Sequence, residues 1–167
     1  KATITSTTAP VLKIKFGTGT ERTVTFKSIS GTKITYTYAI ASGDNGSLAV
    51  SSYSGTVYDV AGNSTSVTTK ANTGNAITAD TIGPQINNIK VTSPTAGTYK
   101  QGKAITIVAE YSENIYGNAS KATITATTAP VLKLKFGTGA EQQATFKSVS
   151  GTKITYAYTI KSGNNGI

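Results

Sequence analysis

Acidic side chains are the groups in this 167-residue chain that could carry acid–base chemistry, and only Glu110 and Glu113 stand close together in the sequence. A glycosidase needs two carboxyl groups that face each other across a cleft, roughly 5–10 Å apart. Here one glutamate ends an expected strand, the other lies in the loop after it, and the chain has no Trp on which a sugar could stack. The pair is therefore interpreted as a solvated strand end, and we expect no catalytic residues.

The composition excludes several classes of site. There is no Cys, His, Met or Trp, which excludes a zinc site, a cysteine nucleophile and every histidine-based triad. Gly17-Thr18-Gly19 and its copy at residues 137–139 are not followed by the Lys-Ser/Thr of a phosphate-binding loop, so they are read as turns. No nucleophile–base pair is visible, and we expect that the protein is not an enzyme.

Asp59 and Asn63 form the most specific oxygen-rich pattern, Asp-x-x-x-Asn, in the segment GTVYDVAGN. Hard cations such as calcium bind clustered oxygens from carboxylates, amides and backbone carbonyls. The alternative is that both side chains hydrogen-bond the backbone of their own turn, and the sparse acidic content, seven residues in all, favours this second interpretation.

An internal repeat determines the organisation of the chain. Residues 1–47 return at 121–167 with 35 of 47 positions identical, which gives a period of 120 residues. This period is too long for a helical or leucine-rich solenoid and suits a tandem array of whole small domains. We therefore interpret residues 1–79 as the C-terminal part of one repeat, residues 80–167 as the N-terminal part of the next, and the chain as a fragment of a longer protein.

Alternation of apolar and polar residues predicts strands throughout. Leu12, Ile14 and Phe16 alternate with two lysines, and the segment 33–40 alternates in the same way. Such a pattern places one face on a core and the other in water, as in an antiparallel sandwich. Further strands are expected at 85–92 paired with 104–111, at 55–60 and 64–69 around the turn 61–63, and in a hairpin that turns at Ser30-Gly31. This gives about seven strands per repeat.

Three segments resemble the repeats of a known family. Residues 80–84, DTIGP, resemble the D-T-x-x-P opening of bacterial immunoglobulin-like repeats in large surface proteins. Residues 97–114 look like their G-T-Y-K-x-G-x-x-I-x-I-x-V-x-F-S-E stretch, and residues 55–63 are similar to their closing G-T-x-x-D-x-A-G-N element. The resemblance implies an all-β chain of tandem immunoglobulin-like antiparallel β-sandwiches in an extracellular, adhesin-type setting on the bacterial cell surface.

In an immunoglobulin-like layout, Asp59, Asn63, Asp80 and Glu113 fall near one pole of a repeat. The resemblance implies that calcium at such a pole would stiffen the joint between neighbouring repeats. These four residues are therefore the candidate metal ligands, and the turn-bracing alternative stays open.

The net charge of +9 comes mainly from lysines spread along the chain. Edge lysines that block unwanted strand pairing are the favoured interpretation. Attraction to an anionic cell-wall polymer or to lipid headgroups is the alternative. Specific nucleic-acid binding is not expected, because there is no arginine cluster and no nucleic-acid motif, and no transmembrane run occurs in the sequence.

The function expected from these features is a non-catalytic structural or adhesive module of a repetitive bacterial surface protein, serving as stalk, biofilm or envelope material. Its partners would be neighbouring repeats or copies of the same chain. One alternative is a glycan-binding accessory module of a secreted enzyme, for which Tyr53, Tyr99, Tyr111 and Tyr116 are the candidate exposed aromatics. The other is a fibre subunit that assembles by strand donation.

Overall fold

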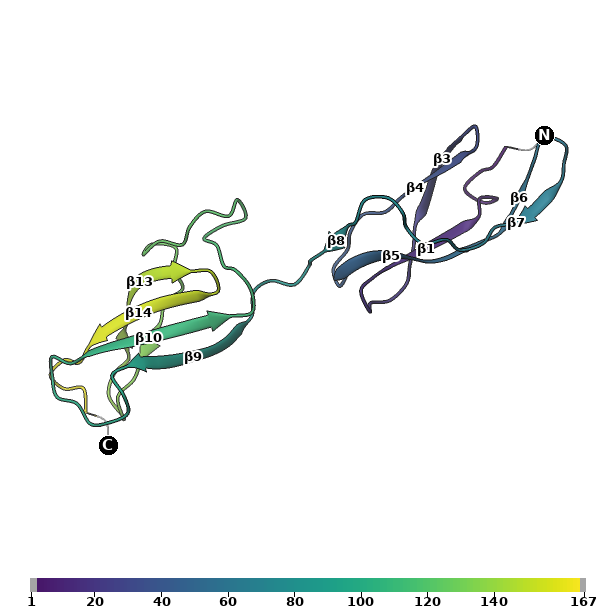
Figure 1. Cartoon of the computed structure of the whole chain (residues 1–167). Helices are drawn as coiled ribbons and strands as arrows, with labels where there is room; N and C mark the ends of the chain where they lie inside the picture. Colours follow the sequence, from purple (N-terminus) through teal and green to yellow (C-terminus); the bar gives the residue numbers. More distant parts are fainter. Residues whose placement is uncertain (1–2, 166–167) are drawn as a thin grey trace. The chain divides into compact units, whose positions relative to one another are not determined.

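The computed structural model describes residues 3–165, which form fourteen β-strands and no helix (Figure 1). The chain divides into two compact units, Lys1–Ile82 and Gly83–Ile167, called unit 1 and unit 2 below. Every pairing between strands is antiparallel. The predicted all-β antiparallel architecture is therefore confirmed.

Unit 1 contains eight of the strands. These are β1 (Val11–Phe16), β2 (Arg22–Thr23), β3 (Thr25–Ser30), β4 (Lys33–Thr37), β5 (Gly46–Ser54), β6 (Thr56–Tyr58), β7 (Ser64–Ser66) and β8 (Thr78–Ala79). One four-stranded sheet has the order β2-β1-β5-β8, and β3-β4 and β6-β7 form separate two-stranded sheets. The predicted pair around the turn at 61–63 is thus confirmed, with shorter strands than expected.

The core of unit 1 follows from the alternation in β1. Ile14 and Phe16 are buried, with 6% and 2% of their surface exposed, and the intervening lysine is half-buried on the other face. Leu48 of β5 lies opposite Phe16 and packs against this cluster. The apolar side of β1 therefore holds β5 in place.

Unit 2 contains the remaining six strands. These are β9 (Ile86–Ser93), β10 (Ala104–Tyr111), β11 (Lys133–Leu134), β12 (Gln142–Gln143), β13 (Thr145–Ser150) and β14 (Lys153–Thr159). One four-stranded sheet has the order β13-β14-β10-β9, and β11-β12 form a second sheet. The predicted strand at 104–111 has the bounds expected, and its pairing with the strand before it is confirmed.

The core of unit 2 is centred on the pairing of β10 with β14. Ile107 lies opposite Tyr156, and Ala109 lies opposite Ile154. All four residues are buried, Ile154 completely so. Strict alternation along β14 places every second side chain in this core, which is what the period-2 pattern predicts.

The hairpin predicted at Ser30-Gly31 is present in both units, as β3-β4 and as β13-β14. Gly31 and Gly151 adopt positive φ values of 55° and 57° at the turn. Side chains with a Cβ rarely adopt this left-handed conformation, so glycine suits the turn at both places.

The two copies of the repeated sequence differ in strand length. Residues 11–16 form a six-residue strand, whereas residues 131–136 contain only the two residues of β11. Conversely, β4 ends at Thr37 and Ile40 is 53% exposed, whereas β14 runs to Thr159 and Ile160 is buried. The expectation that the first copy alternates as far as Ile40 is therefore wrong.

Partner strands account for these differences. The longer copy of each strand has an additional neighbour: β1 pairs with β5, and β14 pairs with β10. Among the described residues, β11 pairs only with β12 and β4 pairs only with β3. A strand needs a hydrogen-bonded neighbour to stay extended, so nearly identical sequences form strands of unequal length.

Candidate functional site

The Asp59 turn connects β6 to β7 and holds the first predicted pair of oxygen ligands. One carboxylate oxygen accepts hydrogen bonds from the backbone N–H groups of Ala61 and Asn63, both at 2.9 Å. The other accepts a bond from the Asn63 side-chain amide, also at 2.9 Å. These bonds, those from Asn63 first, lower the pKa of Asp59. The carboxylate thus braces its own turn.

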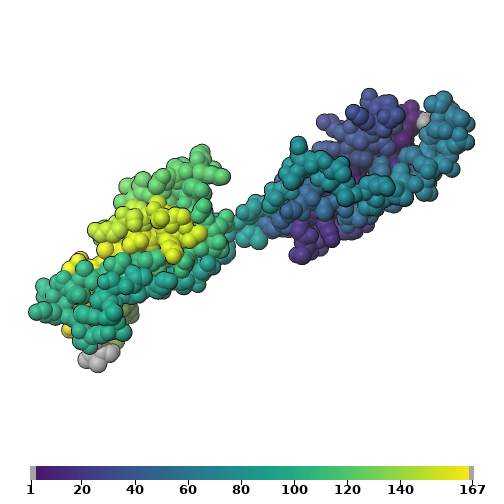
Figure 2. All heavy atoms as spheres, in the orientation of Figure 1, coloured from purple at the N-terminus to yellow at the C-terminus, as the bar shows by residue number. Residues whose placement is uncertain are grey.

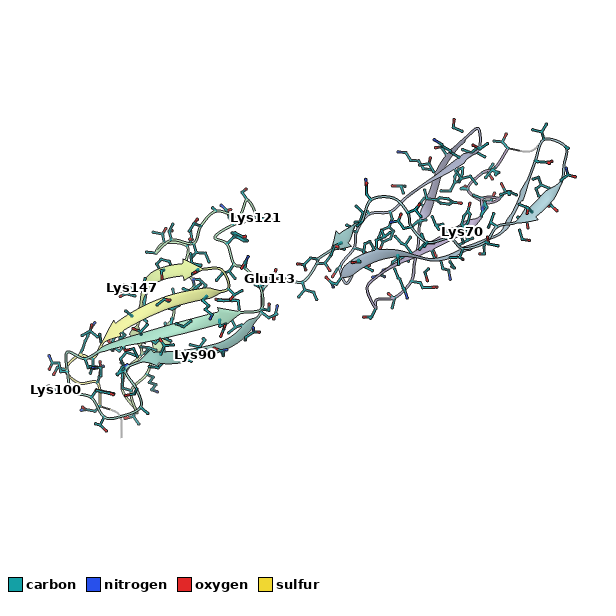
Figure 3. The ribbon with its side chains drawn as sticks, in the orientation of Figure 1. Lys70, Lys90, Lys100, Glu113, Lys121 and Lys147 are labelled. Carbon is teal, nitrogen blue, oxygen red and sulfur yellow. The ribbon has the colours of Figure 1, made fainter. Side chains whose placement is uncertain are left out.

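Asp80 and Glu113 are not part of this turn. Asp80 accepts a bond from the backbone N–H of Ile82 at 3.2 Å, and Glu113 belongs to unit 2, in the loop after β10 (Figure 3). Within residues 3–165, no three acidic side chains gather closely enough to hold a metal ion. The arrangement around Asp59 fits turn bracing better than metal ligation, and calcium binding stays a prediction.

Glu110 is held by three side chains of its own sheet. It accepts bonds from Asn88 at 3.1 Å and Lys90 at 3.5 Å on β9, and it pairs with Lys153 on β14 at 3.2 Å. The hydrogen bond from Asn88 is the largest cause of the lowered pKa of Glu110, and the bond from Lys153 is the next. A carboxylate held ionised in this way ties β9, β10 and β14 together and is poorly suited to donating a proton.

An ion pair between the buried Asp44 and the half-buried Arg22 in unit 1 was not predicted. Asp44 is only 3% exposed, and it accepts bonds from Arg22 at 2.9 Å, from the Tyr38 hydroxyl at 2.7 Å and from the backbone N–H of Ala41 at 2.8 Å. The Ala41 bond first, then those of Tyr38 and Arg22, lower the pKa of Asp44. This cluster closes the loop between β4 and β5.

Unit 2 contains the neutral counterpart of this ion pair. Asn164 accepts bonds from the Tyr158 hydroxyl at 2.6 Å and the Lys161 backbone N–H at 2.8 Å, and Gln142 accepts a longer bond from Tyr158 at 3.4 Å. Gln142 and Asn164 are the repeat equivalents of Arg22 and Asp44.

The two positions therefore change together, from a charged pair to an uncharged one. The change between Arg22 and Gln142 is therefore not independent variation of a solvent-facing residue, because each side chain is bonded within its cluster. The paired substitution was the signal that sequence reasoning missed.

The tyrosines lie mainly against the cores. Tyr156 and Tyr158 are buried, and Tyr36 and Tyr38 are half-buried. Of the four tyrosines predicted to be exposed, only Tyr116 is, at 48%; Tyr53, Tyr99 and Tyr111 are half-buried. Tyr58, which was not singled out, is the most exposed at 70%. Since Tyr58 and Tyr116 belong to different units, neither unit presents a pair of exposed tyrosines for stacking on a sugar.

Most lysines are exposed, including Lys70 in unit 1 and Lys90, Lys100, Lys121 and Lys147 in unit 2 (Figure 3). Five ion pairs occur among the described residues, and four of them join exposed or half-exposed partners. Such surface pairs contribute little to stability. Much of the positive charge therefore faces solvent.

Across residues 3–165, the structure contains no helix of the length and apolarity needed to cross a bilayer. No protein-family model, curated protein sequence or solved structure matches the chain.

Proposed function

We propose that the chain carries parts of two immunoglobulin-like repeats of a bacterial surface protein, in which the repeats act as non-catalytic structural or adhesive modules. The observation that carries the proposal is the repeated block, which builds several of the same internal contacts in both units. Tyr36 donates to the Pro10 carbonyl at 2.7 Å, and Tyr156 donates to the Pro130 carbonyl at the same distance. Repetition of a whole packing arrangement builds length and multivalency rather than an active site.

The strands of the two units complement each other when they are aligned through the 120-residue period. The sheet β9-β10-β14-β13 corresponds to the A-B-E-D order of an immunoglobulin-like domain. The sheet β2-β1-β5 of unit 1 then supplies the C′-C-F strands. A complete repeat would thus be a sandwich of these two sheets, which supports the immunoglobulin-like assignment.

The acidic residues support a structural role. Asp44 anchors a loop, Asp59 braces a turn and Glu110 ties three strands together. A catalytic acid or base must instead be free to reach a substrate.

Exposed lysines are also suited to an anionic partner on the cell surface, the alternative to edge protection, and a phosphate-rich wall polymer has the required chemistry. Sedimentation of the chain with purified bacterial walls tests this. We expect binding in low salt that weakens strongly above roughly 0.1–0.15 M, where the Debye screening length shortens to about 8–10 Å. Walls stripped of the polymer are the control. Equal binding to stripped walls, or binding indifferent to salt, would contradict the proposed partner.

The stalk role has its own test. A sandwich repeat spans roughly 35–45 Å, from a rise of ~3.3 Å per residue plus end loops. Small-angle scattering from chains with increasing numbers of repeats should therefore show a maximum dimension that grows by about this amount per repeat. A maximum dimension that grows only with the cube root of the mass, as for a compact particle, would rule out the stalk.

A further inference from the structure

Unit 2 leaves apolar surface uncovered where unit 1 covers it. Phe16 is 2% exposed beside Leu48 of the neighbouring strand β5, whereas its equivalent Phe136 is only half-buried. On β9, Ile86, Ile89 and Val91 are 50–58% exposed. These three residues lie in register with the core-facing side of β10, so they belong to an inner face that lacks a cover.

A hollow in the surface of unit 2 adjoins this inner face. It is lined by residues of β9, β10 and the loop 94–99, and by three residues of the repeated block 121–167. The lining includes Val91, Ile105, Phe136, Ile160 and Asn164. The atoms of β9 and its following loop, teal in Figure 2, form part of the visible surface of unit 2.

We propose that this hollow, together with the free edge of β11, is a strand-acceptor groove for a segment that has the sequence of β5. The register follows from unit 1, where Leu48 lies opposite Phe16 and Val50 lies opposite Ile14. In the groove, Leu48 and Val50 of the donor would lie opposite Phe136 and Leu134. Backbone pairing at such an edge provides affinity, and the alternate side chains provide specificity.

Further groups around the groove match the same donor. In unit 1, the Ser51 hydroxyl donates to Glu21, which also pairs with Lys13. In unit 2, Glu141 occupies the position of Glu21 and pairs with Lys133 at 2.9 Å, where a donor serine could join it. This polar contact would fix the donor in one register.

Aromatic packing points to the same register. The ring of Tyr53 on β5 packs edge-on against Tyr36, with centroids 6.2 Å apart. Tyr156 is the repeat equivalent of Tyr36 and holds the same bond to a proline carbonyl. A donor tyrosine would therefore find its partner ring in place.

The donor is a segment of a like repeat whose β5 strand is not already engaged. A second intact copy of this chain has β5 paired with β1 and β8, so it is not the occupant. Assigning the donor to a like repeat rests on the modular role proposed above. The groove itself lies in unit 2 and does not depend on the exposed lysines, so loss of wall binding would leave it unaffected.

A synthetic peptide with the sequence of residues 46–56 tests the groove. Titrated into the full 167-residue chain, it should bind saturably at one site. It should slow amide hydrogen exchange across residues 131–136 by at least roughly tenfold. Residues 11–16 already have their partner strand and serve as the internal control, so their exchange should not change.

The experiment has two controls, a charged peptide and the chain without peptide. A peptide with Leu48→Asp and Val50→Asp keeps the backbone but places charges on the apolar floor, so it should not bind. Without peptide, the chain should sediment as a monomer. Absence of saturable binding, equal binding of the charged peptide, or a peptide-free dimer that protects residues 131–136 would each overturn the proposal.

Discussion

Replacement of Ile154 by alanine should destabilise unit 2 much more than Ile34→Ala destabilises unit 1, although the two isoleucines occupy equivalent positions. Ile154 is fully buried opposite Ala109. Its loss removes three buried carbons, worth about 2.4 kcal/mol, and the remaining cavity raises the expected cost to about 3–4 kcal/mol. Ile34 is half-buried because β4 lacks the additional strand, so its cost should be about 1 kcal/mol.

Native-state hydrogen exchange measured separately on β14 and β4 gives the free energy of opening for each unit. The expected difference of about 2.5 kcal/mol corresponds to roughly a 60-fold difference in the effect on the opening equilibrium. Conservative Ile→Val variants at both positions serve as controls. The loss of stability should again be larger at Ile154 than at Ile34, but both losses should be smaller than for alanine. Equal costs at Ile154 and Ile34 would refute the link between partner strands and burial.

Three other outcomes are expected. Phe16→Ala should destabilise unit 1 by about 3–5 kcal/mol, and Phe136→Ala should destabilise unit 2 clearly less, because only Phe16 has Leu48 of a neighbouring β5 packed against it; paired urea titrations followed by exchange would detect this. The lowered pKa of Asp44 means that its contribution to stability is present above the ordinary value of 3.8 and is lost as the pH falls through the lower folded pKa. Asp44→Asn, which copies the neutral Asn164 of unit 2, removes this contribution at every pH, so unit 1 should be less stable at pH 7 and should lose less stability on acidification than the parent; an equal loss with acid in both would exclude this role. Millimolar calcium should leave exchange in the Asp59 turn unchanged, because both carboxylate oxygens already accept hydrogen bonds within the turn; calcium-dependent protection there would instead support the metal site.

Local patterns were enough to predict much of the fold. The alternation in residues 104–111 gave the bounds of β10, because its inner face packs on one core and its outer face meets solvent. The glycine in Ser30-Gly31 gave the hairpin turn, because the backbone there needs a positive φ. Both features depend on contacts that are close in sequence or on simple burial.

Features that depend on distant partners were not predicted. The strand at 131–136 has the same alternation as residues 11–16, yet only two of its residues are extended, since its length depends on whether β5 lies beside it. Likewise, Asp44 and Arg22 are 22 positions apart, and only their joint replacement in the second copy indicates that they touch.

The most direct test of the account is the structure in solution of a chain in which residues 83–167 are followed by residues 48–82, one full period of the repeat. We predict a single closed sandwich in which residues 131–136 are protected from exchange along their whole length and the Phe136 ring is buried. We also predict one cooperative unfolding transition. Residues 131–136 that exchange as freely as in the 167-residue chain, with Phe136 still half-exposed, would contradict this prediction.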